Sequence, residues 1–143
     1  MSKDIINIAI IGFGNIGSYF YKLLETNKKL IFLKTKKKII VKYISAKSIN
    51  KKRLVKIPRS KWFKDPIKLV KKNDVDIVIE LIGGSGGMAK KVVFEALKNK
   101  KHVITANKAV IYSHGDEIFA EAKKYGVHIL FESAVCAGTP IIK

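Results

Sequence analysis

The stretch that decides the fold is Ile5-Ile6-Asn7-Ile8-Ala9-Ile10-Ile11-Gly12-Phe13-Gly14-Asn15-Ile16-Gly17. Residues 5–11 form a nearly continuous apolar run that stops at a glycine, which is typical of a strand buried on both faces of a parallel sheet. Residues 15–27 then carry apolar side chains at helical spacing, at positions Ile16, Phe20, Leu23 and Leu24. A buried strand, a glycine-rich turn and a helix in this order predict the start of an α/β domain.

The turn between that strand and that helix has the pattern G-x-G-x-x-G, the fingerprint of a dinucleotide site. The first glycine would allow the tight turn, the second the approach of backbone to a pyrophosphate, and the third close packing of the helix. The helix amides would then face the pyrophosphate charge. We therefore predict cofactor contacts along the whole motif: Gly12, Phe13, Gly14, Asn15, Ile16 and Gly17. The alternative is a glycine-rich turn that binds nothing.

The rest of the chain continues the alternation of strands and helices. Strands are predicted at about 39–46, 75–82, 102–105 and 127–131. Helices are predicted at 65–73 with Asp65 as N-cap, at 88–99, and from a capping box of Ser113 and Asp116 to Gly126. The lysine-rich residues 28–38 are predicted as an exposed connection, and 47–64 as a loop with a short helix or turn. This order predicts a single α/β domain with a doubly wound, Rossmann-type parallel sheet covered on both faces.

The end of the second strand bears on the choice between NAD and NADP. Domains that prefer NAD usually place an acid there, which bonds the ribose 2′-hydroxyl. Here the residues are Ile44-Ser45-Ala46-Lys47-Ser48, without an acid. A lysine and two hydroxyls suit a 2′-phosphate better, so the sequence favours NADP with Lys47 as a contact, although Lys47 as an ordinary surface lysine remains an alternative.

Composition limits the other classes of function. The net charge is +18, but 27 of the 29 basic residues are lysine and they are spread along the chain, so we expect a solvated basic surface and no nucleic-acid site. No apolar run reaches the roughly 20 residues that span a bilayer. The single cysteine, Cys136, cannot form an internal disulfide, which fits a reducing cytoplasm. We expect a cytoplasmic protein without a membrane partner.

Three later blocks resemble successive parts of homoserine dehydrogenase: residues 80–84, ELIGG; residues 102–108, HVITANK; and residues 131–140, FESAVCAGTP. The resemblance covers essentially the whole chain and is weakest from 28 to 64. It implies an NAD(P)-dependent oxidoreductase that interconverts L-aspartate 4-semialdehyde and L-homoserine by hydride transfer, in the route to threonine and methionine. NADP is the expected cofactor and NAD is possible.

The resemblance also implies roles for particular residues. The family's lysine beside the nicotinamide and substrate corresponds to Lys108, which is therefore the candidate catalytic residue, held to help proton transfer. Gly83, Thr105 and Lys108 are the further expected cofactor contacts. Because Lys108 is one of 27 lysines, a plain surface role is the alternative.

In the last block the family binds a sodium ion through backbone carbonyls, which suit a hard cation. The matching positions are Glu132, Val135, Ala137 and Thr139, although residues 136–139 depart from the Gly-Gly-Ile pattern of many relatives. Cys136 itself is interpreted as a packed small residue. The three histidines lack metal-ligand spacing and are interpreted as incidental.

The expected organisation is a dinucleotide-binding domain at 1–134 and, at 135–143, the start of a link to a missing catalytic domain. The sequence ends in an apolar run, which predicts a truncated chain that binds cofactor and scarcely catalyses alone. The complete protein is expected to be a homo-oligomer. A nucleotide-sensing regulatory domain without catalysis is the second hypothesis, and a basic nucleic-acid-binding domain is the third.

Overall fold

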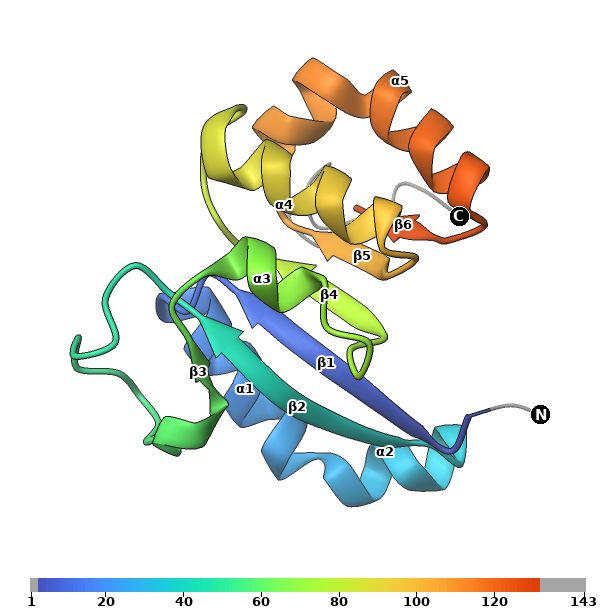
Figure 1. Cartoon of the computed structure of the whole chain (residues 1–143). Coiled ribbons are helices and arrows are strands. Elements are labelled where there is room, and N and C mark those ends of the chain that lie inside the picture. Colours follow the sequence, from blue (N-terminus) through green and yellow to red (C-terminus); the bar gives the residue numbers. More distant parts are fainter. Residues whose placement is uncertain (1–2, 132–143) are drawn as a thin grey trace.

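The computed structural model describes residues 3–131 of the chain as one parallel sheet flanked by helices (Figure 1). The six strands of this part of the chain lie in the order β3-β2-β1-β4-β5-β6, and every neighbouring pair is parallel. Their bounds are β1 Ile5–Ile11, β2 Lys38–Ser45, β3 Trp62–Phe63, β4 Ile77–Glu80, β5 His102–Thr105 and β6 Ile129–Leu130. The strand order reverses direction between β1 and β4, so the predicted doubly wound sheet is confirmed.

Helices cover both faces of this sheet (Figure 1). They are α1 Asn15–Thr26, α2 Lys28–Thr35, the short 3₁₀ helix η1 Arg59–Lys61, α3 Pro66–Val70, α4 Gly87–Lys98 and α5 Lys108–Tyr125. Side chains of α1 pack with Ile8, Ile10 and Val41 in one core. Those of α3, α4 and α5 pack in a second core on the other face, with Ala9 and Ile11. The alternation along β1 therefore divides its side chains between the two cores, as a central strand requires.

The lysine-rich segment 28–38 was predicted as an exposed connection; it is exposed, but the prediction that it is only a connection is wrong. It forms the helix α2, which ends at Lys36 in the left-handed conformation, with φ of 56°. The apolar residues of α2 are consecutive, so they do not show the spacing of an amphipathic helix, and none of its residues is buried. The segment has no glycine or proline to stop a helix, and its residues tolerate helical backbone well.

The start of the last helix is a second correction. We predicted that Ser113 and Asp116 open it, whereas α5 begins at Lys108 and Asn107 is its N-cap. The Asn107 side chain accepts a hydrogen bond from the backbone N–H of Val110 at 3.2 Å, which satisfies one of the unpaired amides of the first turn. The helix is interrupted at His114, with φ of −140°, directly after the predicted start. The end of the helix at Gly126, with φ of +65°, is as predicted.

The remaining elements agree with the predictions in type, and α3, β4 and β6 are shorter than predicted. Asp65 caps α3 through the amides of Ile67 and Lys68, but the helix ends at Val70, before the predicted 73. The strands β4 and β6 are shorter than predicted at both ends. The segment 47–64, predicted as a loop with a short helix or turn, contains the short helix η1 and also the two residues of β3, which pair with Ile44 and Ser45. This strand was not predicted, because so short a strand leaves no alternation to read.

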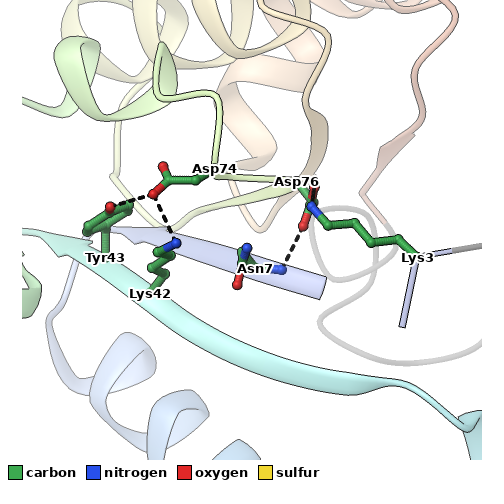
Figure 2. A network of polar contacts seen from close by, with 6 residues as sticks. All are labelled: Lys3, Asn7, Lys42, Tyr43, Asp74 and Asp76. Atoms are coloured by element: carbon green, nitrogen blue, oxygen red, sulfur yellow. Dashed lines mark hydrogen bonds and ion pairs between the residues drawn. The ribbon is translucent and has the colours of Figure 1, made fainter. Parts of the chain in front are cut away.

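At the amino end of β4, polar contacts join the strands to the preceding loop (Figure 2). The Tyr43 hydroxyl donates to an Asp74 carboxylate oxygen at 2.7 Å, and this bond holds the pKa of the Asp74 carboxyl below its usual value. Asp76 accepts from the backbone N–H of Asn7 at 2.8 Å and from Lys3 Nζ at 2.6 Å. These contacts join β1 and β2 to the loop before β4, away from the glycine motif. Among residues 3–131, no helix is long and apolar enough to cross a membrane.

Candidate functional site

The predicted cofactor residues gather at the carboxyl edge of the sheet. In the ladder Ile11 is paired with Ser45 of β2 and with Glu80 of β4, and Glu80 is paired with Thr105 of β5. The four strands therefore end side by side, and the segments that follow them meet at one edge. These segments carry the glycine motif, Lys47, Gly83 and Lys108, in that order along the chain.

The three glycines of the motif have different surroundings. Gly12 has φ of +97°, and a Cβ added to it would lie 2.5 Å from the backbone oxygen of Leu81. A Cβ added to Gly17 would lie 2.5 Å from the backbone oxygen of Gly12. A Cβ on Gly14 would meet nothing within 4 Å. Gly12 and Gly17 are thus required by the packing of the turn, whereas Gly14 faces open space that a ligand can enter.

The first turn of α1 is suited to an anion. Gly14 is the N-cap residue and offers no side-chain hydrogen bond to the helix amides, and no acidic residue lies in the first turn. Such a helix start presents backbone N–H groups and the positive end of the helix dipole. Asn15 and Ile16 are exposed here, and Ile16 is 67% exposed. Phe13, in contrast, is 2% exposed and packs edge-on against Trp62, so its backbone alone reaches the edge.

A cavity of about 310 Å³ adjoins this helix start. It is lined by Phe13, Gly14, Asn15, Ser18, Lys51, Lys52, Arg53 and Leu54. Three consecutive cations of the loop after β2 therefore lie against the second glycine of the motif. The predicted contact Lys47 is exposed and is not among the lining residues. This cavity was not predicted from the sequence; the signal for it is the run of three basic residues, 51–53, in the loop after the second strand.

Arg53 differs from its neighbours because its guanidinium is already bonded to the protein. Its Nε donates to the backbone oxygen of Phe13 at 2.8 Å, and its other nitrogens donate to the backbone oxygens of Ser48, Ile49 and Lys51. The guanidinium also lies 4.8 Å from the centroid of the Trp62 ring. Arg53 thus fixes the loop to the glycine turn, which leaves Lys51 and Lys52 as the cations available to a ligand.

Beyond β4 and β5 the site is built around a buried carboxyl. Glu80 and Thr105 are both 0% exposed, and the Thr105 hydroxyl donates to Glu80 Oε2 at 2.5 Å. The other Glu80 oxygen accepts from the backbone N–H of Ile82 at 2.6 Å. Burial raises the pKa of the Glu80 carboxyl, although the hydrogen bonds from Thr105, Ile82 and Asn107 oppose this shift. Thr105 is therefore buried at the carboxyl end of the sheet, and its hydroxyl is already hydrogen-bonded to Glu80.

Gly83 and Lys108 occupy the surface of this half of the edge. Gly83 is exposed, and a Cβ on it would meet nothing within 4 Å. Lys108 is exposed and is the first residue of α5, directly after the Asn107 cap. The lysine of the predicted catalytic block is therefore held at a helix start beside the predicted cofactor edge.

Other predictions concern residues that lie elsewhere. The predicted sodium positions Glu132, Val135, Ala137 and Thr139, together with Cys136, lie outside the described residues. The rings of His102 and His128 stack at 5.3 Å, and His102 Nδ1 accepts the backbone N–H of His128. Among residues 3–131, no three His, Cys, Asp or Glu side chains are grouped as metal ligands would be.

Comparisons with known proteins point to one family. Residues 12–132 match the family model described as the NAD binding domain of homoserine dehydrogenase. The homoserine dehydrogenase of Neisseria gonorrhoeae is 39% identical over 138 residues, which cover 96% of this chain and 31% of that protein. The enzyme of Bacillus subtilis is 34% identical, and the match covers 96% of this chain and 32% of that protein. The chain thus spans about a third of the length of these relatives.

Solved structures agree with this result. The crystal structure of Staphylococcus aureus homoserine dehydrogenase at pH 8.5 matches with a TM-score of 0.85 and 34% identity, over 94% of this chain and 33% of that one. A hyperthermophilic archaeal homoserine dehydrogenase in complex with NADPH matches with a TM-score of 0.79 and 25% identity, over 96% of this chain and 46% of that one. The chain belongs to the homoserine dehydrogenase family, in which it corresponds to the NAD-binding domain.

Proposed function

We propose that this chain is the cofactor-binding part of a homoserine dehydrogenase and that its preferred cofactor is NADP. The observation that carries the preference is the cavity beside Gly14, which Lys51 and Lys52 line at the carboxyl edge of the sheet. No acid follows β2, where an NAD-preferring domain would bond the ribose 2′-hydroxyl. The hyperthermophilic archaeal homoserine dehydrogenase that this chain resembles was determined in complex with NADPH. Lysines act as phosphate partners through their charge, so this edge suits a 2′-phosphate.

In the proposed arrangement the pyrophosphate lies at the start of α1, next to Gly14, and the adenosine 2′-phosphate lies towards Lys51 and Lys52. Lys47, on the same loop, is the second candidate for the 2′-phosphate. The reaction would be the interconversion of L-aspartate 4-semialdehyde and L-homoserine, with a nicotinamide cofactor exchanging the hydride. In that reaction Lys108 would help proton transfer, which requires its side chain to reach the substrate oxygen.

Titration with NADPH and NADH tests the preference. Wild type should bind NADPH more tightly. Lys51→Ala and Lys47→Ala should each weaken NADPH binding by about 1 kcal/mol, roughly fivefold, and leave NADH binding unchanged, because only the 2′-phosphate is affected. Lys98→Ala, an exposed position in the last turn of α4, is the control for a lost charge. Equal affinities of wild type for NADPH and NADH would contradict the proposed preference.

The role of Lys108 requires a protein that also carries a substrate-binding region. Residues 1–143 alone should bind NADPH but show no measurable oxidation of homoserine with NADP⁺, because the hydride-donating carbon of homoserine must be held in a near-attack geometry. In a chimera that joins this chain to the remaining part of the Bacillus subtilis relative, Lys108→Ala should lower kcat by about 10²-fold, the scale of positioned proton transfer. Cofactor affinity should fall less. A fully active Lys108→Ala enzyme would refute this role, and robust activity of residues 1–143 alone would refute the need for a further region.

Several finer features remain part of the proposal. A sodium ion bound by the carbonyls of residues 132, 135, 137 and 139, a homo-oligomeric complete protein and a cytoplasmic location stay predictions. The absence of a nucleic-acid partner also stays a prediction, and an excess of duplex DNA during the NADPH titration tests it. The regulatory domain without catalysis is not favoured, because residues 12–132 match the NAD binding domain of an enzyme.

A further inference from the structure

A continuous set of hydrogen bonds joins the ends of β4 and β5 to the start of α5. The backbone N–H of Asn107 donates to Thr105 Oγ1 at 3.0 Å. The Thr105 hydroxyl proton is therefore directed to Glu80 Oε2, at 2.5 Å, while Glu80 Oε1 accepts from the N–H of Ile82. Both carboxyl oxygens of Glu80 thus accept hydrogen bonds. The bond from the Asn107 N–H to Thr105 Oγ1 fixes the direction in which the Thr105 hydroxyl donates to Glu80.

Asn107 extends this set to the loop that follows β4. Its Nδ2 donates to the backbone oxygen of Ile82 at 2.7 Å and to that of Gly84 at 2.8 Å. Its Oδ1 accepts from the N–H of Val110 in the first turn of α5. One side chain therefore ties the loop that carries Gly83 to the helix that begins at Lys108. We call Glu80, Thr105 and Asn107 the edge network.

Burying the edge network lowers the stability of the fold, because it removes a carboxyl group from water. A carboxyl with 0% exposure loses its hydration, and an apolar side chain of similar size would avoid that loss. Each member is nevertheless satisfied by a donor or acceptor of matching type, and the set is used to fix two surface segments. This combination suggests that the network serves the ligand site above it.

The position of the network assigns it to one half of the cofactor. The strand order reverses between β1 and β4, and a dinucleotide in such a fold lies across that point. The lysines of the 310 Å³ cavity follow β2, on one side of the reversal. The edge network follows β4 and β5, on the other side. If the 2′-phosphate half lies over β2, the nicotinamide half lies over β4 and β5.

We infer that the edge network is a positioning device for the nicotinamide half of the cofactor, in which Glu80 and Thr105 orient Asn107, and Asn107 holds the loop of Gly83 and the start of α5 in a fixed relation. None of the three side chains needs to contact the ligand. This inference rests on the proposed function, because it takes the placement of the dinucleotide from it.

Two probes separate the halves of the site: NADPH, and adenosine 2′,5′-bisphosphate, which has the 2′-phosphate but no nicotinamide. Asn107→Asp removes both donors to the loop and keeps an N-cap acceptor for α5. Thr105→Val removes the hydroxyl at nearly constant volume. Each should weaken NADPH binding about tenfold and leave the affinity for the bisphosphate within twofold of wild type. Thr105→Ser, which restores the hydroxyl, should recover most of the loss.

Two results would overturn the inference: unchanged NADPH affinity in the folded variants, or an equal loss of affinity for NADPH and for the bisphosphate. If Thr105→Val and Asn107→Asp both fail to unfold cooperatively in urea, the network is structural and the inference is likewise overturned. If wild type binds neither probe, the proposed function fails, and that result is distinct because it appears before any variant is made.

Discussion

The glycines at 12, 14 and 17 belong to one motif, but the structure gives them separate tasks. Gly12 and Gly17 leave no room for a Cβ, because each would approach a backbone oxygen at 2.5 Å. Gly14 has that room and is the one glycine of the motif that a ligand could require. The motif predicted the position of the turn from local sequence. The close contact of Gly12 with Leu81 could not be predicted, because it depends on how β4 pairs with β1.

A matched pair of substitutions tests this division. Gly14→Val should change the free energy of unfolding by about 1 kcal/mol or less, since the N-cap position has open space around it. Gly17→Val should cost about 3 kcal/mol or more, because the new side chain meets backbone that cannot move without displacing the turn. Urea unfolding followed by circular dichroism measures both. Similar losses for the two variants would contradict the assignment.

The basic residues show the same difference between a position predicted from local sequence and a position that depends on the fold. Lys47 was identified from its place just after the second strand, and the structure leaves it exposed, outside the cavity. Lys51 and Lys52 reach the glycine turn because the loop folds back over it. The fold of a loop without periodicity cannot be read from its sequence, so the nearer lysines were not predicted.

At the scale of the elements, the side chain of Arg53 joins the loop between β2 and η1 to the glycine turn and to β3. The guanidinium of Arg53 donates to four backbone oxygens, one of them on the glycine turn and three within the loop. It also lies over the ring of Trp62, which belongs to β3. The planar fork of arginine can make all these bonds at once, which the single ammonium of lysine cannot.

We therefore expect Arg53→Met to lower the free energy of unfolding by about 2–3 kcal/mol, through lost hydrogen bonds and a lost cation–π contact. The Arg53→Lys protein should still lose more than half of the free energy of unfolding that the Arg53→Met protein loses. The exposed Arg59 in η1 supplies the control, because Arg59→Met removes the same charge. Urea unfolding of the three variants measures the differences. An Arg53→Met protein as stable as the Arg59→Met protein would show that the loop does not depend on this residue.

Elements with strong local signals were predicted, whereas an element without a periodic pattern was missed and one with a second possible cap was given the wrong start. The strands β1 and β5 and the Asp65 cap follow from short sequence patterns. The helix α2 was missed because its apolar residues are consecutive and none is buried. The start of α5 was misplaced because Asn107, whose carboxamide bonds two carbonyls of the loop after β4 besides its own helix, is a stronger cap than the Ser113 pattern.

For the whole molecule, alternating strands and helices were enough to predict a doubly wound parallel sheet. The order of the strands required the structure, and that order places the basic loop and the edge network on opposite sides of the reversal between β1 and β4. The candidate site is therefore predicted in its phosphate-binding centre, where the signal is local. On its flanks, Lys47 was predicted from its place after the second strand, and Gly83, Thr105 and Lys108 from the family resemblance. The lysines of the cavity and the hydrogen bonds of the edge network were not predicted, because they depend on contacts between segments far apart in the chain.

We propose above all that the chain binds a nicotinamide dinucleotide across Gly14 and the start of α1. Titration of NADPH fluorescence with residues 1–143, wild type beside Gly14→Val, tests it most directly. We predict saturable binding to wild type and an affinity at least about 100-fold lower for the folded Gly14→Val protein, since a branched side chain would occupy the space of the pyrophosphate. Equal NADPH affinities of the two folded proteins, or no saturable binding to wild type, would contradict the claim.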